Sequence, residues 1–330
     1  MKKDRLMKDA LYFHRLKKEK RALESDIRVH SEWLSSHPRS IDSKDKISES
    51  EKKIVEIDVL LAKEPPTPEL PPRQPLIKVS GVLEEIDILL ARGFFSGREY
   101  EPEEFERNES NRLWGSVILA AVGESAAAAV HSQDDIREAD VYDFVKGKIN
   151  GKPFYGWLGR TTAIPGDYIE LAAIDKNGHY EVYALALPKL RTVSMFPRCY
   201  QAIYSKALMD LKSIIYLPFG MAAFVCVFGI FFPGISVDEN FFIFLGYIAT
   251  VMMAYCIIAS PFAYYRNVKK PNPINVMAQR IFTALEMKEP EKINLEKITK
   301  EKSKHKSRQE NQKRIMPDYR EWVDYYYYYY

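Results

Sequence analysis

Two long stretches without charge place the strongest constraint on this chain. Residues 213–237 and 241–265 are 25 residues long each and contain no Asp, Glu, Lys or Arg. A helix needs about 20 mostly apolar residues to cross roughly 30 Å of hydrocarbon. We therefore expect a two-helix transmembrane hairpin with spans at about 213–235 and 241–265. Two core helices of a soluble domain are the weaker alternative.

The rest of the chain is highly polar, and this division excludes two classes of protein. All 93 charged side chains lie in the other 280 residues, about 33% of that part, although the whole chain is 28% charged with a mean hydropathy of −0.30. Such averages alone are typical of a soluble protein. Their distribution along the chain argues against a single soluble globule, and the apolar length is too short for a many-helix transporter.

Charge around the hairpin predicts its orientation. The connector 234–240 contains Asp238 and Glu239 and no basic residue, whereas both flanks of the hairpin are basic. By the positive-inside rule, both large polar parts then face the cytosol. The spans carry no ionisable side chain of the kind that marks ion pathways, so the hairpin by itself favours an anchor over a pore.

The N-terminal region, residues 1–63, predicts a helical hairpin or part of a coiled coil. Apolar residues keep a three-to-four spacing over 13–34 and again over 47–61, and the helix breaks at 37–40. Such a pair either packs on its own protein or forms a partner-binding or oligomerising arm. Both interpretations stay open in the sequence.

Residues 64–75 contain six prolines. Proline fixes φ and removes a backbone donor, so the segment predicts an extended, semi-rigid spacer. It is the clearest domain boundary in the chain. We favour a linker over the alternative, a PxxP ligand for another domain.

Residues 76–200 predict an α+β domain built on a small antiparallel β barrel or sheet, OB-like or SH3-like. Asn150-Gly151 is the strongest hairpin signal, because a type I′ turn needs positive φ at both central positions. A second turn is expected at 175–178. A helix insertion is expected at 113–130, which we favour as a buried helix over a third membrane span. The expected strands are 76–88, 143–149, 152–158, 167–174, 179–187 and 191–196.

Residues 201–270 hold the expected transmembrane hairpin, and residues 271–330 form the last region. An amphipathic helix is expected at about 275–287. The chain then becomes rich in Lys and Glu, so we expect a low-complexity basic tail that is a frayed helix or disordered. Tyr325–Tyr330 are six consecutive tyrosines, a run that fits contact with a membrane interface or a partner.

No recognisable motif for catalysis, a cofactor or a metal occurs in the sequence. P-loop, GxSxG, HExxH and GxGxxG patterns are absent, and the three cysteines have neither zinc nor disulfide spacing. His131, Asp134 and Asp135 cluster at an expected helix end, where a histidine interacting with the helix dipole is the simpler interpretation. Asp167 and Glu170 suggest no acid–base dyad. We therefore predict no enzyme and no cofactor, and the net charge of +3 does not indicate nucleic-acid binding.

The β-rich part carries a resemblance to a known family. Its residues are Gly151–Ala173 (GKPFYGWLGRTTAIPGDYIELAA), Tyr183–Arg191 (YALALPKLR) and Phe196–Tyr200 (FPRCY), which lead into the uncharged hairpin. This pattern resembles a group of bacterial type VI secretion system effectors over roughly residues 77–270. The resemblance implies an antibacterial protein that acts on, or from, a bacterial inner membrane, and it supplies no catalytic motif.

Together, these features lead to two functional hypotheses. The first is a type VI secretion effector, a bacterial toxin that inserts into and permeabilises a bacterial inner membrane. Its expected partners are the lipid bilayer, further copies of itself, and secretion machinery or an immunity protein. The alternative is a resident inner-membrane scaffold whose cytosolic β domain binds a partner. In both cases the expected location is the inner membrane with two spans and cytosolic termini, or the target cell if the chain is secreted.

Overall fold

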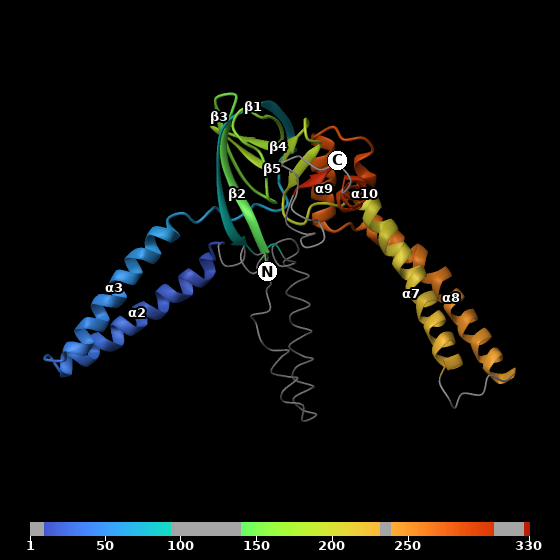
Figure 1. Ribbon diagram of the computed structural model, residues 1–330, viewed down its shortest axis with the longest axis horizontal. Coiled ribbons are helices and arrows are strands. Elements are labelled where there is room, and N and C mark those ends of the chain that lie inside the picture. Colours follow the sequence, from blue (N-terminus) through green and yellow to red (C-terminus); the bar gives the residue numbers. More distant parts are fainter. Residues whose placement is uncertain (1–9, 94, 96–139, 232–238, 307–326) are drawn as a thin grey trace.

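A closed β barrel lies at the centre of the molecule, with two helical pairs projecting from it (Figure 1). The computed structural model describes residues 10–93, 95, 140–231, 239–306 and 327–330. The expected helix at 113–130 lies outside these residues, as does most of the basic tail.

Five strands form the barrel. They are β1 (Ile77–Gly93), β2 (Asp140–Ile149), β3 (Lys152–Leu158), β4 (Tyr168–Lys176) and β5 (His179–Leu187). Their order is β3-β2-β1-β4-β5 with antiparallel neighbours, and a short parallel pairing between β3 and β5 closes the ring. The long first strand pairs with β2 along one part and with β4 along the other. This order is that of an OB-type barrel rather than an SH3-type one.

Local turn chemistry explains the two hairpins. Asn150 and Gly151 have φ of 51° and 74°, and β2 pairs with β3 directly across them, so the hairpin predicted there is confirmed. Gly178, with φ of 97°, supports the turn between β4 and β5. Both turns place the strands in the register that the hydrophobic pattern requires.

Alternate residues of the strands pack into two separate clusters. One gathers apolar side chains from all five strands, among them Leu83, Val145, Phe154, Leu171 and Leu185, and fills the barrel. The other lies on the outer face and joins strand residues to helices from elsewhere in the chain. The strands are therefore apolar on both faces, as expected for strands that are covered on both sides.

The outer cluster is covered mainly by the segment after the second helical pair. Helix α9 (Pro273–Ala284) buries Met277, Ile281 and Phe282 against it. Asn272 caps the helix by accepting a hydrogen bond from the Ile274 amide at 2.9 Å. A 3-10 turn, η1 (Pro290–Lys292), and helix α10 (Leu295–Lys306) follow.

The tyrosine run ends as a strand rather than a disordered tail. β6 (Thr192–Met195) extends the sheet from β5, and β7 (Tyr328–Tyr329) pairs antiparallel with β6. The Tyr329 amide donates to Thr299 Oγ1 at 2.9 Å, and Tyr327–Tyr329 are buried. The free edge of β6 gives these backbone groups partners that the sequence pattern does not reveal.

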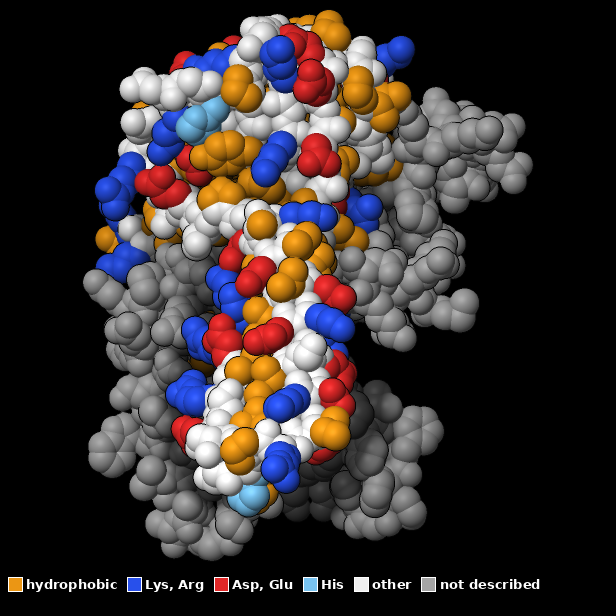
Figure 2. Space-filling view, turned by 90° about the vertical axis from the view of Figure 1, so that its left-hand side faces the viewer, with side chains coloured by type: hydrophobic (Ala, Val, Ile, Leu, Met, Phe, Trp, Pro, Cys, Tyr) orange, Lys and Arg blue, Asp and Glu red, His pale blue; other side chains and the backbone are white. Residues whose placement is uncertain are grey.

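The N-terminal arm is an antiparallel helical pair. It consists of α2 (Phe13–Ser36) and α3 (Ile41–Leu61), and the Ser40 side chain caps α3. Lys20 joins the helices through Asp58 at 2.6 Å. Figure 2 shows charged side chains along the flanks of this arm with apolar ones between them. Val29 of α2 and Val55 of α3 are exposed.

The expectation of a two-span transmembrane hairpin is wrong. The second helical pair comprises α7 (Ile203–Phe231) and α8 (Glu239–Lys269). Among the residues that the structure describes, none of the helices offers an apolar stretch of the length needed to cross a membrane. The described start of α7 is polar: it carries Lys206, Asp210 and Lys212, and Asp210 accepts a hydrogen bond from Asn267 of α8 at 2.9 Å.

The expected fold class, an α+β membrane protein, and the expected two-span membrane location are therefore both corrected. The structure is an α+β chain with a closed five-stranded barrel. The prediction of a multi-pass inner-membrane protein with two spans is wrong for the same reason.

Gly156 permits the closure between β3 and β5. A Cβ placed on Gly156 would overlap the backbone carbonyl oxygen of Val182 on β5. The obstacle is backbone, which cannot rotate away as a side chain could. A residue without a side chain is therefore required where the two strands approach.

Replacing Gly156 by alanine is expected to destabilise the protein by about 2–3 kcal/mol or more, because the added methyl group forces β3 away from β5. The free energy of unfolding from denaturant titration measures the effect. Gly220→Ala is the control, since an added Cβ on this exposed helical glycine meets no neighbouring atom. That variant should be neutral or up to about 1 kcal/mol more stable. Equal stabilities of the two variants would refute the role of Gly156.

A buried carboxylate makes stability depend on pH. Asp143 on β2 is 1% exposed and is paired with Arg160 at 3.0 Å. Burial raises the pKa of Asp143 to about 6 from 3.8, although Arg160 and the Thr161 amide act in the opposite direction. A raised folded pKa means that this group's contribution is fully present below about pH 4 and is lost as the pH rises through about 6.

Asp143→Asn should remove that dependence. We expect the stability of the wild type relative to this variant to increase by up to about 3 kcal/mol between pH 7 and pH 4. Urea titrations of both proteins at pH 7 and pH 4 give their free energies of unfolding. The other carboxylates are the same in both proteins, so their contributions cancel when the two values at each pH are subtracted. Asp87→Asn, at an exposed position on β1, is the matched control. A difference that stays constant or falls on acidification would contradict the assignment.

Candidate functional site

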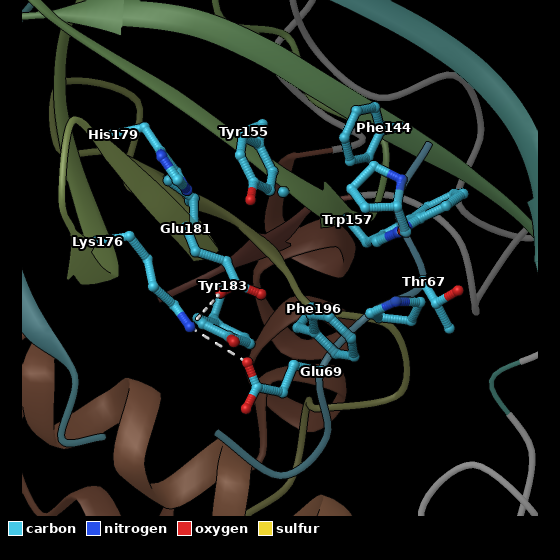
Figure 3. A pocket seen from close by; sticks show the side chains of 14 residues that line it. Thr67, Glu69, Phe144, Tyr155, Trp157, Lys176, His179, Glu181, Tyr183 and Phe196 are labelled. Atoms are coloured by element: carbon cyan, nitrogen blue, oxygen red, sulfur yellow. Dashed lines mark hydrogen bonds and ion pairs between the residues drawn. The ribbon is translucent and has the colours of Figure 1, made fainter. Parts of the chain in front are cut away.

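A row of aromatic side chains lies on the outer face of the barrel, under the proline-rich segment (Figure 3). Tyr155 and Trp157 are two residues apart on β3 and so point to the same face. Phe144 of β2 stands opposite Trp157 in the strand register, with ring centroids 5.2 Å apart. Tyr183 of β5 and Phe196 after β6 form the facing pair, 5.6 Å apart. We call these five side chains the aromatic groove.

The proline-rich segment is attached to this groove. Trp157 Nε1 donates a hydrogen bond to the Pro66 carbonyl oxygen at 3.0 Å. Lys176 Nζ lies 3.3 Å from Glu69 Oε2. Further along, Arg280 of α9 donates to the Pro72 carbonyl at 3.0 Å. The segment is therefore a docked part of the fold, held largely through carbonyls that proline leaves available.

A cavity of about 250 Å³ remains between the segment and the barrel. Its walls are the aromatic groove and Pro66–Glu69, and its charged lining residues are Glu69, Lys176 and Glu181. The Lys176 ammonium group is shared between the two carboxylates, since it also lies 3.6 Å from Glu181 Oε2. His179 stacks on Tyr155 at the same end, with ring centroids 4.8 Å apart.

The protonation states of the cavity residues follow from these contacts. Burial, followed by the nearby Glu181 carboxylate, raises the pKa of Tyr155 and of Tyr183. The hydrogen bond to Glu69 is the largest effect on Lys176 and raises its pKa. At neutral pH the tyrosines are thus neutral and the lysine is charged. The arrangement supplies hydrogen bonds, ring faces and fixed charge but no activated nucleophile.

The chemistry-bearing residues considered in the sequence do not come together. His131, Asp134 and Asp135 lie outside the described residues. Asp167 Oδ2 accepts from the Ile164 amide at 3.0 Å, whereas Glu170 pairs with Lys78 at 3.1 Å. In the described ranges, His, Cys, Asp and Glu side chains form no group of three suited to holding a metal ion.

The residues of the groove were not predicted as a site from the sequence. A usable sign was present in the Tyr155-Gly156-Trp157 pattern, in which two large aromatics share one face of a strand. The proline run 64–75 was a second sign. Their contact was not predictable, because Trp157 and Pro66 are 91 residues apart in the chain.

Comparison with known proteins adds no name to this site. No protein-family model, curated protein or solved structure matches the chain. The resemblance to type VI secretion effectors therefore stays a prediction from the sequence.

Proposed function

We propose that this protein is an interaction scaffold whose barrel binds an extended, proline-rich segment in the aromatic groove. The observation that carries the proposal is the hydrogen bond from Trp157 Nε1 to the Pro66 carbonyl within a row of aromatic rings. The proposal retains one part of the scaffold hypothesis from the sequence, a β domain that binds a partner, and drops its inner-membrane location.

The physical basis is the chemistry of polyproline recognition. A proline-rich segment is already extended before it binds, so little conformational entropy is lost. Its carbonyl groups point outward and accept hydrogen bonds, while its rings pack on flat aromatic faces. Trp157 offers both a ring and a donor, and Phe144 and Phe196 extend the apolar surface on either side.

In the structure the groove holds the protein's own segment. A partner segment of the same chemistry has to displace it, and a tethered segment competes at an effective concentration on the order of millimolar. The tether is held by separate contacts, of which the Lys176–Glu69 ion pair is partly exposed and therefore weakened by solvent screening. The groove is thus suited to exchange between an internal and an external segment.

The test uses the full chain with its tether weakened. Pro65, Pro66 and Pro68 are replaced by glycine or serine to empty the groove, and the peptide EPPTPELPPRQP, corresponding to residues 64–75, is added in a calorimetric titration. We expect saturable binding to this variant and much weaker binding to the wild type. Adding Trp157→Phe should weaken binding roughly two- to tenfold, since it removes one hydrogen bond and keeps the ring.

Trp33→Phe is the control for that experiment. Trp33 is an exposed tryptophan on α2 that stacks on His37, remote from the groove. It should leave the peptide affinity unchanged. Absence of saturable binding to the emptied groove, or an affinity insensitive to Trp157→Phe, would rule out this function.

A further inference from the structure

The cavity beside the docked segment has an excess of negative charge. Two carboxylates, Glu69 and Glu181, line it together with a single ammonium group from Lys176. Lys176 is held between them at 3.3 and 3.6 Å. One negative charge is therefore not balanced by the charged residues that line the cavity, which opposes anions and favours a ligand with one positive charge.

The walls of the cavity are largely aromatic. Tyr155, Trp157, Tyr183 and Phe196 contribute rings from β3, β5 and the segment after β6, and Figure 3 shows them arranged around one space. Aromatic faces attract cations through their quadrupole, and quaternary ammonium groups are commonly held by several rings. One ring of the aromatic groove already lies close to a cation, since Lys146 Nζ is 5.7 Å from the centroid of the Phe144 ring.

We infer that this cavity binds a methylated ammonium group. The inference concerns the same site as the proposed function and names a ligand for the space that the docked segment leaves open. A volume of about 250 Å³ lies below the roughly 300–1,000 Å³ of pockets for drug-sized ligands. It suits a small headgroup or one side chain and excludes a nucleotide.

A methylated cation fits better than a primary ammonium group. A primary ammonium ion needs three hydrogen-bond acceptors when it leaves water. The two carboxylates of the cavity are already engaged by Lys176. A methylated ammonium group donates few or no hydrogen bonds, so ring faces and the unbalanced charge are sufficient to replace its hydration. Its source is either a free small molecule of the choline type or a methylated lysine of a protein.

The experiment titrates the full-length protein, with its own segment in place, against choline and against 3,3-dimethylbutanol, the uncharged compound of the same shape. We expect choline to bind roughly tenfold more tightly than the neutral compound, because only choline gains the cation–ring and charge interactions. Glu181→Gln should weaken choline binding severalfold. Lys176→Met should strengthen it, because it removes the competing internal cation.

Glu170→Gln is the matched control. Glu170 lies on β4 and pairs with Lys78 instead of facing the cavity, so its replacement should leave choline binding unchanged. A gain of affinity in Lys176→Met separates a binding role from a structural one, since the loss of a merely structural ion pair would not improve binding. Equal affinity for choline and the neutral compound, or a loss of affinity in Lys176→Met, would overturn the inference.

Two further arms complete the test. A peptide with trimethyllysine, compared with its unmodified form and with free choline, identifies the source of the cation, and binding of none of the methylated probes overturns the inference. Choline binding is measured on the wild type, whereas binding of the proline-rich peptide is measured on the variant in which Pro65, Pro66 and Pro68 are replaced. Peptide binding without choline binding defeats only this inference, and choline binding without peptide binding defeats only the proposed function.

Discussion

The parallel contact between β3 and β5 is the constraint on which the rest of the structure depends. It is short, with Phe154 opposite Tyr180 and Tyr155 opposite Glu181. Gly156 lets the Val182 carbonyl come close enough for the ring to close. Without this contact β3 and the first part of β5, which β6 does not cover, would have open edges, and the barrel would lose its enclosed core.

Closure also creates the candidate site. It brings Tyr155 and Trp157 of β3 beside Tyr183 and Glu181 of β5, which belong to a different hairpin. The strand pattern sends alternate side chains to the barrel interior and to this outer face. The outer face is apolar, so the proline-rich segment and α9 cover it. The site consists of ring faces, carbonyls and three charged groups, and these are the groups on which the proposed binding function rests.

Individual elements show how much of the structure could be predicted from the sequence. The turn at Asn150-Gly151 is local, and it occurs where the sequence places it. The proline run 64–75 predicts an extended segment, but its docking depends on a hydrogen bond to a residue 91 positions away. The expectation of a transmembrane hairpin is wrong, since no helix among the described residues offers an apolar stretch long enough to cross a membrane. The start of α7 carries Lys206, Asp210 and Lys212, and Asp210 accepts a hydrogen bond from Asn267 of α8.

The sequence by itself determined the turns, the strand positions, the helical pair at the start of the chain and the extended proline-rich segment. Each of these depends on the φ preferences and spacing of neighbouring residues, which a local pattern records. The tertiary structure decided the closure of the barrel, the strand made by the last tyrosines and the cavity with its excess carboxylate. These depend on which distant backbones approach each other. That choice is made by the total burial and hydrogen bonding of the folded chain, and no local pattern contains it.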